Sequence, residues 1–167
     1  DGKDNEYMKR IREGIARGIQ MAINGLRGAK ICFGEIKLAG LVRGEPNTEP
    51  DEVMRTMCVE FGFSRIMLVN FGIHPTAIYS RLITGDIAYF LTENLGSLVG
   101  GEAMFINGAQ GGVQPVGGGW INARSIGEKL ALGAVQSLQD SPVIPTSSAI
   151  IIKQKIIYVP LQNTRFI

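Results

Sequence analysis

The sequence predicts an α/β fold in which helices cover a mixed sheet. Helical and strand patterns alternate along the 167 residues, and the length suits a single domain with a sizeable core, so we expect one α/β domain over residues 1–167. Between residues 65 and 106 a helical segment separates two buried strands, which predicts a parallel βαβ unit.

The N-terminal half is predicted to contain one helix and three strands. Apolar residues recur every three or four positions over residues 4–26, as in an amphipathic helix, and close packing against a sheet would account for Gly14 and Gly18. The predicted strands cover residues 29–42, 53–60 and 65–71. Gly34 breaks the alternation of the first strand and indicates a bulge or bend. A polar loop over 43–51 precedes the second strand, and the segment 61–64 reads as a hairpin turn.

The C-terminal half is predicted to alternate helix and strand. A crossover helix over 84–98 leads to the strand 102–106, and a second helix covers 121–139. A loop over 141–145 follows, and the apolar segment 150–161 indicates a last long strand or hairpin arm.

Composition excludes several classes of function. The net charge is +2 and no Lys/Arg cluster is interleaved with aromatic residues, so we expect no nucleic-acid surface. No apolar run reaches the roughly 18 residues of a membrane span. Cys32 and Cys58 are too few for a disulfide framework; they could pair if their strands are neighbours, although two buried thiols are the favoured interpretation.

Polar loops follow both strands of the predicted βαβ unit. The first strand ends in Leu68-Val69-Asn70-Phe71-Gly72-Ile73-His74-Pro75-Thr76, and the second ends in a glycine-rich loop over 107–114. Parallel strands release their loops at the same edge of the sheet, where ligands bind in α/β folds. We therefore expect His74 and the glycine-rich loop to lie close together.

Each of these residues has a functional and a structural interpretation. His74 could ligate a metal, act as a base or make a structural hydrogen bond. The glycine-rich loop could present N–H groups to an oxyanion or simply join a strand to a helix. Asp86 is expected to cap the crossover helix, and Asn70 and Asn107 to satisfy loop backbone groups.

Three segments together resemble the neutral/alkaline non-lysosomal ceramidase family, and the resemblance covers most of the chain. His74-Pro75-Thr76 is similar to the family's His-Pro-Thr element, and Ile83-Thr84-Gly85-Asp86 to its Ile-Ser-Ala-Asp. The run Asn107-Gly108-Ala109-Gln110-Gly111-Gly112-Val113-Gln114-Pro115 resembles its Asn-Gly-x-x-Gly-Asp-Val-Ser/Asn-Pro loop.

The resemblance implies a zinc-dependent hydrolase of amide (N-acyl) bonds acting on a small-molecule or lipid substrate. It implies that His74 is a zinc ligand, with further ligands outside this chain, which would be an internal part of a larger catalytic domain. Gly112 stands where the family usually has Asp, and Gln114 where it has the active-site Ser. Backbone N–H groups from Gly111 to Val113 would steady the oxyanion, and a substrate other than ceramide is expected. The resemblance also suggests a secreted, periplasmic or cell-surface protein, but the residues leave the compartment and the oligomeric state open.

Two other classes of function stay open. Gly112 and Gln114 favour a non-catalytic binding or scaffold domain that retains the ceramidase-like fold. A nucleotide-binding α/β domain is a weaker alternative, because no Gly-x-Gly-x-x-Gly motif follows the first strand.

Overall fold

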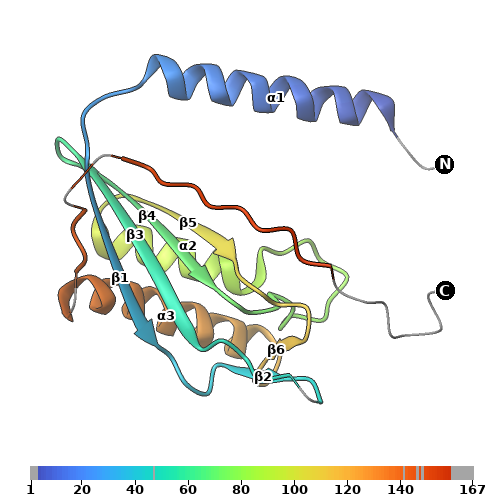
Figure 1. The fold of residues 1–167 in the computed structure, drawn as a ribbon. Coiled ribbons are helices and arrows are strands. Elements are labelled where there is room, and N and C mark those ends of the chain that lie inside the picture. Colours follow the sequence, from blue (N-terminus) through green and yellow to red (C-terminus); the bar gives the residue numbers. More distant parts are fainter. Residues whose placement is uncertain (1–3, 47, 141, 146, 148, 159–167) are drawn as a thin grey trace.

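The computed structural model describes residues 4–46, 48–140, 142–145, 147 and 149–158 (Figure 1). The helices are α1 (Asn5–Asn24), α2 (Asp86–Val99) and α3 (Trp120–Asp140). The strands are β1 (Lys30–Lys37), β2 (Val42–Gly44), β3 (Val53–Phe61), β4 (Ser64–Phe71), β5 (Glu102–Asn107) and β6 (Val113–Pro115).

Four strands form one mixed sheet in the order β1-β3-β4-β5. β3 pairs antiparallel with both β1 and β4, whereas β4 and β5 are parallel and are joined by the crossover helix α2. The predicted α/β class and the βαβ unit over 65–106 are therefore confirmed. β2 and β6 form a separate two-stranded ribbon.

The core lies between the sheet and the helices α2 and α3, which pack on each other and on the sheet (Figure 1). Fully buried side chains come from the central strands, such as Met54, Val69 and Phe71, and from the helices, such as Leu91 and Leu130. Alternate positions on the outer strands are exposed: Ile31 and Phe33 on β1 are 41% and 40% exposed, and Met104 on β5 is 55% exposed. Within the described residues, the covering helices thus protect one face of the sheet.

Gly34 does not form the predicted bulge. β1 and β3 pair without interruption, with Gly34 opposite Thr56. The glycine serves helix packing instead, because a Cβ at this position would collide with the backbone carbonyl oxygen of Ser137 on α3. The predicted strand 29–42 is also divided: β1 ends at Lys37, and after a turn with Gly40 at φ 78° the chain enters β2, which has a different partner.

Helix α1 is amphipathic but lies apart from the core (Figure 1). The Asp4 carboxylate accepts hydrogen bonds from the N–H groups of Glu6 and Tyr7 and so caps its first turn. None of its residues is buried, and nothing lies within 4 Å of a Cβ built on Gly14 or Gly18. Packing against a sheet therefore does not explain these glycines. None of the described helices has the length and apolar character needed to cross a membrane.

The predicted strand or hairpin arm over 150–161 is wrong for its described part. Residues 149–158 have no regular secondary structure, and Ile150, Ile152 and Ile157 are largely exposed, because no strand among the described residues pairs with them. Residues 159–161 lie outside the described residues. In the predicted loop 141–145, Ser141 also lies outside them, while Val143 pairs with Phe33 through two backbone hydrogen bonds.

We predict that Gly34→Ala lowers the free energy of unfolding by about 1–3 kcal/mol, the usual cost of overpacking a core. The new methyl group must displace α3 at Ser137. Gly28→Ala is the matched control, since nothing lies within 4 Å of a Cβ there and its effect should stay within about 0.5 kcal/mol. Urea denaturation followed by circular dichroism measures both, and equal stability of the two variants would contradict the close contact.

Candidate functional site

The loops after β4 and β5 meet at one edge of the sheet, as the βαβ pattern predicted. The backbone N–H of Gly108 donates to the carbonyl oxygen of Phe71 at 3.0 Å. The N–H of His74 donates to the carbonyl oxygen of Val113 at 3.3 Å. His74 and the glycine-rich loop are therefore neighbours in space, although the chain between them contains a whole helix.

Two glycines allow this close approach. A Cβ on Gly108 would lie 3.0 Å from the backbone nitrogen of Gly72, and a Cβ on Gly72 would lie 2.8 Å from the carbonyl oxygen of Ala109. Any side chain at either position would push the loops apart. The two loops therefore contact each other through backbone atoms. Only glycine permits so short a separation, because any Cβ would collide with the other loop.

The His74 side chain is half-buried, and its Nδ1 atom is buried without a hydrogen-bond partner among the described residues. Buried polar atoms are rarely left unpaired, because an unsatisfied one costs about 1–3 kcal/mol. A structural histidine would normally use both ring nitrogens. The unpaired Nδ1 atom is therefore the candidate donor to a metal ion or another ligand at this edge.

Asp86 fixes the segment that follows His74. Its carboxylate is 5% exposed and accepts hydrogen bonds from the N–H groups of Ala77 at 3.1 Å, Ile78 at 2.7 Å and Ile87 at 2.7 Å. The N-cap of α2 is Gly85 and no side chain caps it, so the predicted capping role of Asp86 is wrong: Asp86 is the first residue of the helix, and its bond from Ile87 joins chain neighbours. The other two bonds hold the chain just beyond His74-Pro75-Thr76, and sequence reasoning missed them because their partners lie eight and nine residues upstream.

Asp86 adopts an uncommon backbone conformation to do this. Its φ is 52°, in the left-handed region that aspartate tolerates better than most residues. Its own N–H donates to the Thr84 hydroxyl at 3.0 Å. The Thr84-Gly85-Asp86 run is therefore a tight turn that aims the carboxylate back at the first loop.

The glycine-rich loop offers fewer free N–H groups than expected. The Val113 N–H, one of the predicted oxyanion donors, already donates to the Gln110 carbonyl at 2.9 Å within a turn. Gly111 and Gly112 donate no hydrogen bond to the described residues. Gly111 has open space around its Cα, whereas a Cβ on Gly112 would lie 2.8 Å from the Thr48 hydroxyl oxygen. The side chain that the ceramidase pattern has at Gly112 could not fit here unless Thr48 moved.

Gln114 lies on β6, next to this loop. It is half-buried and pairs with Arg43 across the β2–β6 ribbon. The two asparagines do not make the predicted bonds to loop backbone among the described residues: Asn70 donates to the carbonyl of Ile106 within β5 at 3.0 Å, and Asn107 donates to the Gln110 side-chain oxygen at 2.7 Å.

The described residues supply one evident zinc donor at this edge. His74 is the sole histidine of the chain, and no group of three or more His, Cys, Asp or Glu side chains gathers in the described part of it. A catalytic zinc typically takes about three protein ligands. His74 fits the part of one ligand, and a complete zinc site requires donors from beyond the described residues.

We predict that Asp86→Asn destabilises the protein by about 2 kcal/mol or more, because an amide cannot replace a carboxylate that accepts three N–H bonds. Amide hydrogen exchange at Ala77 and Ile78 should accelerate. Asp51→Asn is the control: Asp51 is exposed and a hydrogen bond from Arg55 lowers its pKa, yet such surface pairs contribute within about 0.5 kcal/mol. Unchanged exchange at Ala77 in Asp86→Asn would refute the anchoring role.

Comparison with known proteins relates this chain to ceramidases by fold. No protein-family profile and no curated protein sequence matches it. Neutral ceramidase from Pseudomonas aeruginosa matches with a TM-score of 0.63 and 20% identity, covering 77% of this chain and 25% of that one. A ceramidase structure described as complexed with C2 matches with a TM-score of 0.62 and 19% identity over the same shares. The chain thus has the fold of about a quarter of the ceramidase chains it matches.

Proposed function

We propose that this chain contributes to the catalytic domain of a zinc-dependent hydrolase of amide (N-acyl) bonds. The buried, unpartnered Nδ1 of His74 carries the proposal, because it lies at the sheet edge where α/β folds bind ligands. The fold shared with neutral ceramidase supports a hydrolase, and the name of that enzyme suggests an N-acyl lipid or a related small molecule as substrate.

In this proposal His74 would hold a zinc ion, which when bound would supply Lewis-acid polarisation of the amide carbonyl. Asp86 keeps the segment after His74 in place through Ala77 and Ile78. The N–H groups of Gly111 and Gly112 are the backbone donors left for an oxyanion, and the Gln114 amide is a further one. Gln114 cannot act as a nucleophile, so hydrolysis would proceed by direct attack of water.

A second candidate is a non-catalytic binding domain with the same fold. One observation favours it: Thr48 occupies the space in which a side chain at Gly112 would lie. A glycine there removes the carboxylate that the ceramidase pattern has at this position. In this alternative the sheet edge still binds a small molecule or lipid, without turning it over.

We predict that the complete protein binds about one zinc ion per chain at this edge and that His74→Ala lowers zinc affinity by at least about a hundredfold, because it removes a direct ligand. Elemental analysis after dialysis measures this. Gln136→Ala, on the exposed surface of α3, serves as a control and should leave zinc content unchanged. Equal zinc in His74→Ala and the parent would eliminate His74 as a ligand.

We also predict that Gln114→Ala lowers kcat for the N-acyl substrate by about a hundredfold, the usual loss when an oxyanion donor is removed. Gln114→Ser should raise turnover of N-acyl sphingosine relative to Gln114→Ala. Gln136→Ala, on the exposed surface of α3, is the matched control and should have no effect.

Steady-state turnover of a small N-acyl panel measures these rates. A change of less than about tenfold in Gln114→Ala, or about 1.4 kcal/mol in the barrier, would remove Gln114 from the oxyanion site. No turnover by zinc-loaded parent protein on any N-acyl substrate would favour the non-catalytic domain.

A further inference from the structure

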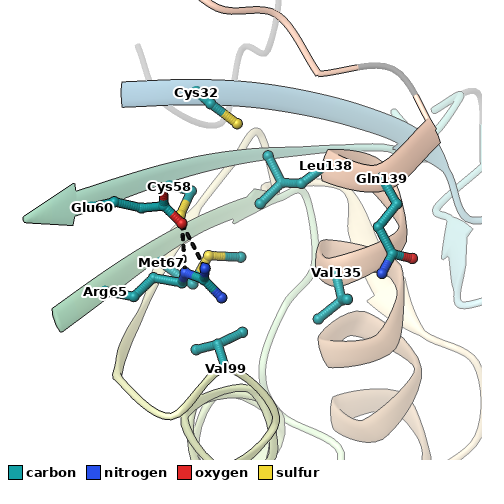
Figure 2. A pocket seen from close by; sticks show the side chains of 9 residues that line it. All are labelled: Cys32, Cys58, Glu60, Arg65, Met67, Val99, Val135, Leu138 and Gln139. Carbon is teal, nitrogen blue, oxygen red and sulfur yellow. Dashed lines mark hydrogen bonds and ion pairs between the residues drawn. The ribbon is translucent and has the colours of Figure 1, made fainter. Parts of the chain in front are cut away.

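A cavity of about 240 Å³ lies at the other end of the sheet from His74, among the sheet, α2 and α3 (Figure 2). Arg65, at the start of β4, and Glu60, near the end of β3, line its mouth and form an ion pair of 2.6 Å. Three sulfur-containing side chains, Cys32, Cys58 and Met67, line the interior. Neither the hydrolase nor the binding-domain proposal uses any of them.

The three sulfur residues form one row across the sheet. Cys32 on β1 is the register partner of Cys58 on β3, and Cys58 is the register partner of Met67 on β4. Directly paired residues of adjacent strands point to the same face. Here that face is the one covered by the helices, since Cys58 is 4% and Met67 1% exposed.

The hydrogen-bonding pattern sets the spacing of this row. The N–H and carbonyl of Phe33 bond to Val143, away from β3, so those of its neighbour Cys32 face β3. Cys32 and Cys58 are thus a hydrogen-bonded pair, with a Cα separation of about 5.5 Å, and Cys58 and Met67 a non-hydrogen-bonded pair at about 4.5 Å. Cys58 lies in the middle of the row, between Cys32 and Met67, and Figure 2 shows the Cys32 sulfur turned toward the space beside α3.

We propose that Cys32, Cys58 and Met67 form a binding site for a single Cu(I) ion. Two thiolates and a thioether are a soft donor set, which selects Cu(I) over hard cations. Zinc sites use thiolate, imidazole and carboxylate rather than thioether, so Met67 separates the two metals. Binding is balanced by proton release: Cu⁺ replaces the two thiol protons and leaves a complex of charge −1.

The surroundings of Cys32 and Cys58 suit thiols that stay protonated until a metal ion binds. Burial, and next the Glu60 carboxylate, raise the pKa of both thiols, while Arg65 opposes this. Both cysteines are free thiols. The half-buried Cys32 and the open mouth of the cavity give an ion a route inward. A disulfide would use two members of the row and give the third, Met67, no role.

The test is an anaerobic titration of the reduced protein with Cu(I) in competition with a chromogenic Cu(I) chelator. We expect one Cu(I) per chain, an ultraviolet thiolate-to-copper charge-transfer band, and an X-ray absorption spectrum with sulfur as the nearest neighbour. Cys32→Ser should weaken binding by about a hundredfold or more, and Met67→Leu by at least about tenfold. Leu replaces Met with little change in volume, and Met104→Leu on β5 is the matched control that should bind as the parent does.

Equal Cu(I) affinity of Met67→Leu and Met104→Leu would overturn the three-sulfur site. So would Cu(I) binding that persists in Cys32→Ser, or no binding by the reduced parent. A Cys32–Cys58 disulfide detected by mass spectrometry after exposure to Cu(II), with no copper retained on reduction, would instead assign the pair as a redox couple. Zinc content at His74 is measured independently, so failure here leaves the hydrolase proposal untouched.

Discussion

The parallel pairing of β4 with β5 is the constraint on which the candidate site depends. Parallel neighbours need a crossover, and α2 provides it by burying Ile87, Leu91 and Leu95 against the sheet. The same pairing releases both following loops at one edge, where His74 meets the glycine-rich loop. Asp86 then links the start of the crossover helix back to the first of these loops. Helix α2 therefore both packs the core and places the candidate site.

Close backbone contact gives this edge its shape. Gly72 and Gly108 leave no room for a side chain between the loops, and Gly112 leaves room only for Thr48. The polar side chains of the described residues at this edge include the His74 imidazole and the amides of Asn107, Gln110 and Gln114. Amides are poor zinc ligands, so the proposed zinc needs further ligands.

Periodicity along the sequence predicted the elements that pack on a common core, and it failed where the outcome depends on distant residues. The βαβ unit, α2, α3 and the meeting of His74 with the glycine-rich loop follow from local patterns of apolar residues and turns. Gly34 was misread because Ser137, which it accommodates, lies a hundred residues away. The apolar patterns of α1 and of residues 150–158 predicted burial or pairing, but nothing in the described chain covers them. The bonds from Ala77 and Ile78 to Asp86, and the sulfur row, depend on fold and register, which no single segment reveals.

Unpaired buried polar groups bear on whether the sheet edge holds a ligand. Two buried side-chain atoms lack a partner in the described residues, the Thr56 hydroxyl and the His74 Nδ1. Thr56 is 2% exposed, lies opposite Gly34 within the sheet and has no route to a ligand. His74 as a residue is half-buried at the loop edge, although its Nδ1 atom is buried. An unpaired imidazole nitrogen costs about 1–3 kcal/mol, and a hydrogen bond to a nearby carbonyl would remove that cost in a purely structural histidine. A bound ligand or an ordered water at Nδ1 would offset this cost, which is consistent with an edge that holds a ligand.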